Sequence, residues 1–152
     1  DWNESRATEG RALARDLAKR FIRLEVWRGL LKERAPQVKA EKAEALRARI
    51  QAVLDAHALE ADESRLISEI AVLSDRLDVT EELTRLSAHL DQLSGLLAGD
   101  GEAGKRLDFV LQECFREINT CGNKGQDPQI SRIVVDFKAE LEKCREQVQN
   151  LE

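Results

Sequence analysis

The chain has 152 residues, with 24 Lys and Arg residues against 29 Asp and Glu residues, a net charge of -5 and 42% hydrophobic residues. This size and balance indicate one soluble, charge-rich domain. The sequence has no run of about 18 apolar residues and no basic start before a short apolar core, which excludes a readable membrane-spanning helix or secretory signal. We therefore expect a cytoplasmic protein.

Rare residue types indicate the fold class. Aromatic residues make up 4% of the chain and tyrosine is absent, so the core must come from Leu, Ile, Val and Ala, which is typical of helices. No stretch shows sustained strand alternation, and an all-α fold without a sheet is expected.

Methionine is absent and Asp1 is the first residue, so we expect a piece of a longer protein. The three cysteines, Cys114, Cys121 and Cys144, lack disulfide or zinc spacing and are expected to be reduced and packed as small apolar groups.

The first 58 residues carry two helical stripes of apolar side chains, at residues 13–31 and 38–54. Pro36 lies between them and is expected to break the helix. We therefore predict two helices joined near Pro36 as a long antiparallel hairpin over residues 1–58. Residues 59–152 are expected to form a second, helical domain.

Four further helices follow in the pattern, each with apolar residues every three or four positions. Asp62 is expected to cap the first and Asp78 the second. A glycine-rich loop is expected at residues 99–104, and the next helix should end near residue 120, with Gly122 as its C-terminal cap. Asp127 should cap the last helix. The expected ranges are residues 62–77, 78–97, 105–120 and 127–152.

Charge is unevenly distributed along the chain. Residues 1–50 have a net charge of +5, residues 51–103 of -9 and residues 104–152 of -1. A basic segment beside an acidic one can bind phosphate backbone on one surface and divalent cations on another. The alternative is that these charges are solvated or paired along exposed helices.

Polar residues border the apolar seam of the helix over residues 78–97. Glu82, Arg85 and His89 are spaced to share one helical face at the edge of the buried surface. A carboxylate and an imidazole there can bind a divalent metal, or His89 can carry a proton near neutral pH. The alternative is that His89 is a partly buried hydrogen-bonding residue.

The helix over residues 105–120 carries two more polar stripes. Carboxylates spaced i,i+4 can hold Mg²⁺ or Mn²⁺, and neighbouring arginines can bind phosphate. The alternative is a network of salt bridges between helices. Lys124, in the turn that follows, can reach a phosphate or keep the turn soluble. The stripes are Arg106, Glu113 and Glu117, and Gln112, Arg116 and Asn119.

Six segments of the chain resemble the C-terminal region of the YicC/YloC group of bacterial endoribonucleases. They occur in the family's order and span nearly the whole chain. The sequence departs from the family pattern at Lys105, at Cys114 and Phe115, and at Asn123. The segments are residues 3–10 (NESRATEG), 62–70 (DESRLISEI), 78–89 (DVTEELTRLSAH), 104–113 (GKRLDFVLQE), 116–120 (REINT) and 146–152 (EQVQNLE).

The resemblance implies a metal-dependent endoribonuclease that hydrolyses single-stranded RNA and needs Mn²⁺ or Mg²⁺. It also implies a ring-like homo-oligomer, expected to be a hexamer, with other RNA-decay enzymes as further partners, and an N-terminal domain that this chain lacks. On this basis His89, Glu113 and Glu117 are the expected catalytic residues. The expected metal ligands are Glu82, Glu113 and Glu117, and the expected RNA-binding residues are Arg85, Arg106, Gln112, Arg116, Asn119 and Lys124.

A second hypothesis assigns the chain no catalysis. In it, the helices form an oligomerisation and RNA-docking module that presents RNA to another nuclease, and the polar stripes are salt bridges between helices. Its RNA binding would weaken with salt and be indifferent to a chelator, whereas hydrolysis would depend on the metal.

Overall fold

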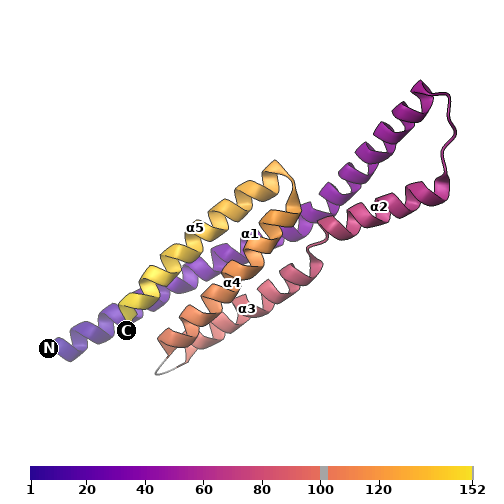
Figure 1. Ribbon diagram of the computed structural model, residues 1–152. Coiled ribbons are helices and arrows are strands. Elements are labelled where there is room, and N and C mark those ends of the chain that lie inside the picture. The colour runs from indigo at the N-terminus through magenta and orange to yellow at the C-terminus, as the bar shows by residue number, and fades with distance from the viewer. Residues whose placement is uncertain (100–102, 152) are drawn as a thin grey trace.

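The structure is a computed structural model that describes residues 1–99 and 103–151, with the side chain of Leu151 excluded. In these residues all regular structure is helical and no strand occurs, so the predicted all-α class without a sheet is confirmed (Figure 1). No described helix is long and apolar enough to cross a membrane. The helices are α1 (Trp2–Ala56), α2 (Glu63–Leu77), α3 (Thr80–Ala98), α4 (Ala103–Gly125) and α5 (Pro128–Leu151).

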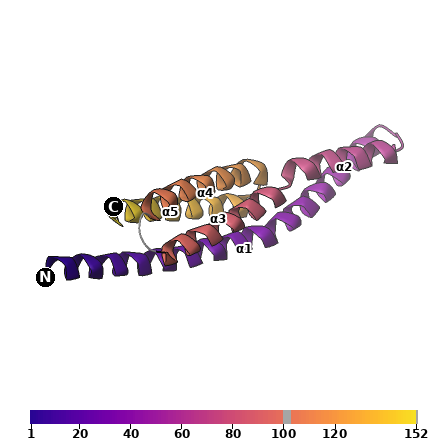
Figure 2. The same cartoon turned by 90° about the horizontal axis from the view of Figure 1, so that it is seen from below.

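The α1 helix is continuous for 55 residues and includes Pro36, so the predicted break there is wrong. The proline ring is exposed, whereas Leu31, Ala35 and Val38 on the opposite side of the helix are buried. Proline removes one helical hydrogen bond and crowds the preceding turn, but the packing of these neighbours holds the helix together. Figure 2 shows α1 curving along its length, as expected for a helix with an internal proline.

A long antiparallel hairpin is present, but its arms are α1 and α2 rather than two helices within residues 1–58 (Figure 1). The chain reverses between residues 57 and 62, where Ala58 has a φ of 52°. Asp62 caps α2 as predicted, because its side chain accepts a hydrogen bond from the backbone N–H of Arg65 at 3.3 Å.

The central part of α1 packs with α3, α4 and α5 as a four-helix bundle, in which α1 contacts α3 and α5, and α4 contacts the same two helices (Figures 1 and 2). The predicted apolar seams of α3, α4 and α5 face this core. Side chains from α1 share it, and the expected division at residue 58 stays a prediction. Side chains with no more than 1% exposure include Leu17, Leu24, Leu86, Leu93, Leu107, Leu111, Ile118, Phe137 and Leu141.

The three cysteines are buried in the bundle and form no disulfide, which confirms the sequence prediction. Burial raises the pKa of each thiol to about 12. The thiols are therefore protonated at neutral pH and behave as small apolar groups.

The α4 helix continues to Gly125, so the predicted end near residue 120 and the capping role of Gly122 are wrong. Both glycines lie against α5. A β-carbon at Gly122 would lie 3.1 Å from Val134 Cγ1, and one at Gly125 would lie 2.6 Å from Ile130 Cγ2. Their missing side chains let α4 and α5 approach each other.

The joint after α4 contains the predicted cap of α5, whereas the joint before α4 lies partly outside the described residues. Gln126 takes the left-handed conformation after α4, with a φ of 47°, and Asp127 accepts from the N–H of Ile130 at 3.1 Å as the predicted cap of α5. The expected loop at residues 99–104 lies partly outside the described residues. Of its described part, Gly104 belongs to α4.

Candidate functional site

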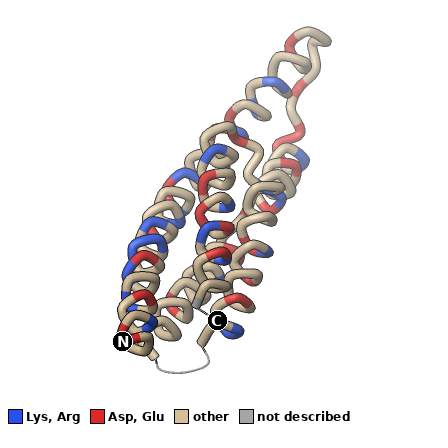
Figure 3. Tube along the Cα trace, turned by 90° about the vertical axis from the view of Figure 1, so that its left-hand side faces the viewer, with Lys and Arg blue, Asp and Glu red and all other residues tan. Residues whose placement is uncertain are grey.

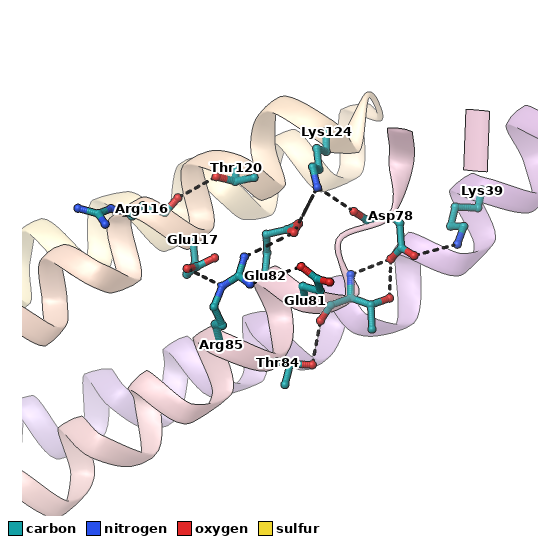
Figure 4. A network of polar contacts seen from close by, with 11 residues as sticks. Lys39, Asp78, Glu81, Glu82, Thr84, Arg85, Arg116, Glu117, Thr120 and Lys124 are labelled. Carbon is teal, nitrogen blue, oxygen red and sulfur yellow. Dashed lines mark hydrogen bonds and ion pairs between the residues drawn. The ribbon is translucent and has the colours of Figure 1, made fainter. Parts of the chain in front are cut away.

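Four predicted site residues meet where the start of α3 faces the end of α4 (Figure 4). Glu82 and Arg85 come from the first turns of α3, and Glu117 and Lys124 from α4. Arg85 Nε donates to Glu117 Oε1 at 2.9 Å, and Lys124 Nζ lies 3.2 Å from Glu82 Oε1. Arg85 Nη2 is also 3.7 Å from Glu82 Oε1, so one guanidinium bridges both carboxylates. We call these four side chains the ionic cluster.

The two carboxylates of the ionic cluster are buried. Glu82 is 3% exposed and Glu117 is 7% exposed, and an isolated carboxylate at such a depth is costly. Lys124 also donates to the backbone carbonyl of Asp78 at 3.3 Å, which ties α4 to the start of α3. Both buried carboxylates are paired with cations, and Arg85 also lies 3.6 Å from the exposed Glu81, so the arrangement is the one that the salt-bridge alternative describes.

Asp78 supports the ionic cluster from the joint between α2 and α3. Its carboxylate accepts hydrogen bonds from the hydroxyl and the backbone N–H of Thr80, and Lys39 of α1 lies 3.7 Å away. The Thr80 hydroxyl is the main reason that the pKa of Asp78 lies below its usual value. The N-cap residue of α3 is Val79, which makes no side-chain capping bond, so the predicted cap by Asp78 is wrong. Asp78 instead accepts from Thr80, the first residue of the helix.

A separate groove lies between the second half of α3 and the first half of α4. It has a volume of about 750 Å³, and three predicted site residues, His89, Arg106 and Glu113, line it. Lys105 and the ring of Phe109 also line the groove, and Phe109 is 63% exposed. Phe109 was not among the predicted site residues, although an apolar residue out of phase with the buried face of α4 is a signal that the sequence contains.

His89 and Glu113 have polar neighbours within the groove region. The Nδ1 atom of His89 lies 3.2 Å from Oε1 of Gln92, an acceptor that favours the tautomer with a proton on Nδ1. That tautomer leaves Nε2 able to accept a proton. Arg116 Nη2 is 3.7 Å from Glu113 Oε1, and the Glu113 side chain is 22% exposed.

The remaining predicted residues lie outside the ionic cluster and do not line the groove. The amide of Gln112 donates to Asp108 at 3.1 Å, and Asp108 also pairs with Arg145 of α5 at 3.1 Å. Arg116 and Asn119 are exposed on α4. The roles assigned to these three residues stay predictions.

The expected metal ligands, Glu82, Glu113 and Glu117, do not form a metal site in the described residues. In the described residues, no group of three or more His, Cys, Asp or Glu side chains is arranged to hold a metal ion. Glu82 and Glu117 are paired with cations, whereas His89 and Glu113 line one groove. The described part of the chain therefore does not gather the expected ligands Glu82, Glu113 and Glu117 into a metal site.

A buried carboxylate that the sequence did not reveal joins α1 to α5. Glu140 is 3% exposed, and its two oxygens accept hydrogen bonds from Arg20 at 2.9 Å and from Arg23 at 3.1 Å. Arg34 and Asp127 form a similar link at 3.0 Å, and this hydrogen bond is the main cause of a lowered pKa at Asp127. These pairs join residues more than 90 positions apart, so no local pattern predicts them.

Residues 31–152 match the family described as "Endoribonuclease YicC-like, C-terminal". The chain belongs to this family. It is 39% identical over 149 residues to the "Probable endoribonuclease YicC" of Clostridioides difficile, which covers 98% of this chain and 50% of that relative. It is 34% identical over 152 residues to the protein of the same name from Haemophilus influenzae, covering 100% of this chain and 52% of that relative.

The comparisons confirm the resemblance to the YicC-like family that the sequence segments indicated. The chain spans about half the length of these two relatives.

Proposed function

We propose that this chain forms part of an endoribonuclease that hydrolyses single-stranded RNA in the groove between α3 and α4. The observation that carries the proposal is that His89 and Glu113 line the same groove as Lys105, Arg106 and Phe109. Groups that can move protons therefore lie beside cations and an exposed aromatic ring. Membership in an endoribonuclease family supports the choice of substrate.

The groove residues suit a single strand of RNA. Lys105 and Arg106 can bind phosphate groups, and arginine can do so through two parallel hydrogen bonds. The exposed ring of Phe109 can stack on a base, a contact worth about 1–3 kcal/mol per base in other proteins that bind single strands. Bases in a duplex are stacked on one another, so this contact favours unpaired RNA.

His89 and Glu113 are the proposed catalytic residues of this chain. Hydrolysis of a phosphodiester needs a group that takes a proton from the attacking oxygen and a group that gives one to the leaving oxygen. An imidazole and a carboxylate in one groove can share these tasks near neutral pH. Glu117, the third expected catalytic residue, has its carboxylate engaged by Arg85, so we propose a structural role for it.

A divalent ion, Mn²⁺ or Mg²⁺, is part of the proposal for the assembled protein. Glu113 is the expected ligand that lines the groove, the other ligands would come from a second copy or from the longer protein, and His89 keeps its proton-transfer role. Such an ion supplies a more acidic bound water and stabilises negative charge on oxygen. A homo-oligomer, with the hexamer as the expected state, and a cytoplasmic location belong to the same proposal.

Cleavage of a labelled single-stranded RNA tests the proposal. The assay compares this chain alone with a chimaera in which it replaces the matched segment of the Clostridioides difficile relative, each with Mn²⁺ or with a chelator. We expect metal-dependent cleavage by the chimaera, reduced at least about 100-fold by Glu113→Gln or His89→Asn. Glu146→Gln, an exposed carboxylate of α5 outside the groove, is the matched control. Equal rates for all three variants would contradict the assignment.

The RNA-docking alternative retains one supporting observation. Glu82 and Glu117, two of the three expected metal ligands, are committed to Arg85 and Lys124. If the RNA-docking alternative is correct, the chain and the chimaera both bind RNA but neither cleaves it. The chelator then leaves the RNA affinity unchanged, whereas added salt weakens it.

A further inference from the structure

A second cleft lies between α1 and the second half of α2, beside the joint of α4 and α5. It has a volume of about 590 Å³. Lys42 and Arg49 of α1 line it from one side, and Arg76 of α2 from the other. None of these residues belongs to the groove or to the ionic cluster, and the proposed function gives them no role.

The charges in this cleft are not balanced. Lys42, Arg49 and Arg76 face a single lining carboxylate, Glu69, and none of the four makes an ion pair with another described residue. Basic and acidic positions occur along all the helices (Figure 3), and some cations of the bundle, such as Arg20, Arg34 and Arg85, pair with carboxylates, whereas the three cations of the cleft do not. A concave surface with an excess of cations attracts anions strongly.

The lining of the cleft adds apolar and amide groups to these cations. Val72 lines the cleft and is 53% exposed, so an apolar surface is open beside the charges. Gln126 also lines it from the joint between α4 and α5, where its φ is 47°. Glycine is the usual residue in that conformation because a side chain makes it unfavourable. The chain instead places an amide there, which can both donate and accept hydrogen bonds.

We propose that this cleft is a second RNA-binding site, which holds backbone phosphates of a strand whose scissile bond lies in the groove. The proposal rests on the proposed function, because that function makes RNA the substrate. Arg76 and Gln92 are 16 residues apart in a mostly helical segment, which places the cleft and the groove on the order of 20 Å apart. A long strand can therefore occupy both sites, whereas a short product occupies only one and leaves more easily.

The test uses a triple variant, Lys42→Gln, Arg49→Gln and Arg76→Gln, and a matched control, Lys143→Gln, Arg15→Gln and Arg47→Gln. Both remove one lysine and two arginines, and the control residues are exposed and line neither site. Binding of labelled RNAs of about 16 and about 4 nucleotides is measured against salt with a chelator present. Thermal unfolding by circular dichroism checks that both variants are folded.

We expect the cleft variant to bind the longer RNA on the order of tenfold to 100-fold more weakly than the control variant does. The slope of log K against log salt should fall by about 2, since each phosphate contact on a single strand contributes about 0.7. Binding of the shorter RNA, held in the groove, should be the same for both. Identical binding of the longer RNA by the two variants would overturn the proposal.

A groove variant, Lys105→Gln with Arg106→Gln, separates the two proposals. If it loses the shorter RNA while the cleft variant matches the control, only the cleft proposal fails. If the unaltered chain binds neither RNA, both proposals fail. A cleft variant that changes the sedimentation of the protein and leaves its RNA affinity unchanged would make the cleft an interface between copies and would also overturn the proposal.

Discussion

Gly125 lies where α4 and α5 come closest, and its role depends on a residue on the other helix. A β-carbon there would lie 2.6 Å from Ile130 Cγ2, a distance that side chains do not tolerate without movement. The sequence shows only a glycine near a helix end, which favours a capping role. In the structure, Gly125 instead allows α4 to pack closely against Ile130 of α5. This contact between helices cannot be predicted from the local sequence.

Gly125→Ala is expected to destabilise the protein by about 1–3 kcal/mol, because the new methyl group overpacks the contact with Ile130. Gly29→Ala is the matched control. Nothing lies within 4 Å of the β-carbon position there, inside the long α1 helix. That change should stabilise the protein by about 0.5–1 kcal/mol, since alanine favours helix. Urea unfolding of both variants measures the difference, and equal stabilities would show that α4 and α5 can separate without cost.

The helices themselves were predictable because each depends on local periodicity. The seams of α3, α4 and α5 and the caps Asp62 and Asp127 follow from spacing alone, and the structure contains them. The break at Pro36 was wrong because packing of Leu31 and Val38 on both sides of the proline outweighs its local preference. For the candidate site, the sequence likewise predicts which residues share a helix face but not which residues meet from different helices. Helix faces place Glu82 with Arg85, but only the fold shows that Arg85 also pairs with Glu117.

Pro36→Ala tests whether packing holds α1 together against its proline. The change restores the N–H that can bond to the carbonyl of Lys32, and we expect it to stabilise the protein by up to about 3 kcal/mol. Ala40→Pro, at another exposed position of α1, should destabilise it by about the same amount. Chemical denaturation monitored by circular dichroism compares them. A loss of stability in Pro36→Ala would mean that the curvature of α1 is needed for its packing against α3 and α5.

Most buried apolar side chains of the described residues share one core, and its first contributors precede the segment that matches the family. The match begins at residue 31, yet Leu17, Phe21 and Leu24 are each no more than 3% exposed in the bundle. Arg20 and Arg23 from the same stretch hold the buried carboxylate of Glu140. The first half of α1 therefore completes the bundle that carries the groove, and the function proposed for the groove depends on it.

Removal of residues 1–30 should therefore unfold the chain or leave it without a cooperative transition. Burial of Leu17, Phe21 and Leu24 contributes about 1.5–3 kcal/mol each, a total of about 5–9 kcal/mol, which rivals the whole stability of a typical domain. The loss of Arg20 and Arg23 adds an unpaired buried charge at Glu140, so Glu140→Gln in the shortened chain should recover part of the stability. Removal of residues 1–9, all exposed, should change it by less than about 0.5 kcal/mol. Thermal and urea unfolding distinguish these chains. A shortened chain, residues 31–152, that unfolds cooperatively within about 1 kcal/mol of the intact one would show that α3, α4 and α5 form a core without the first half of α1.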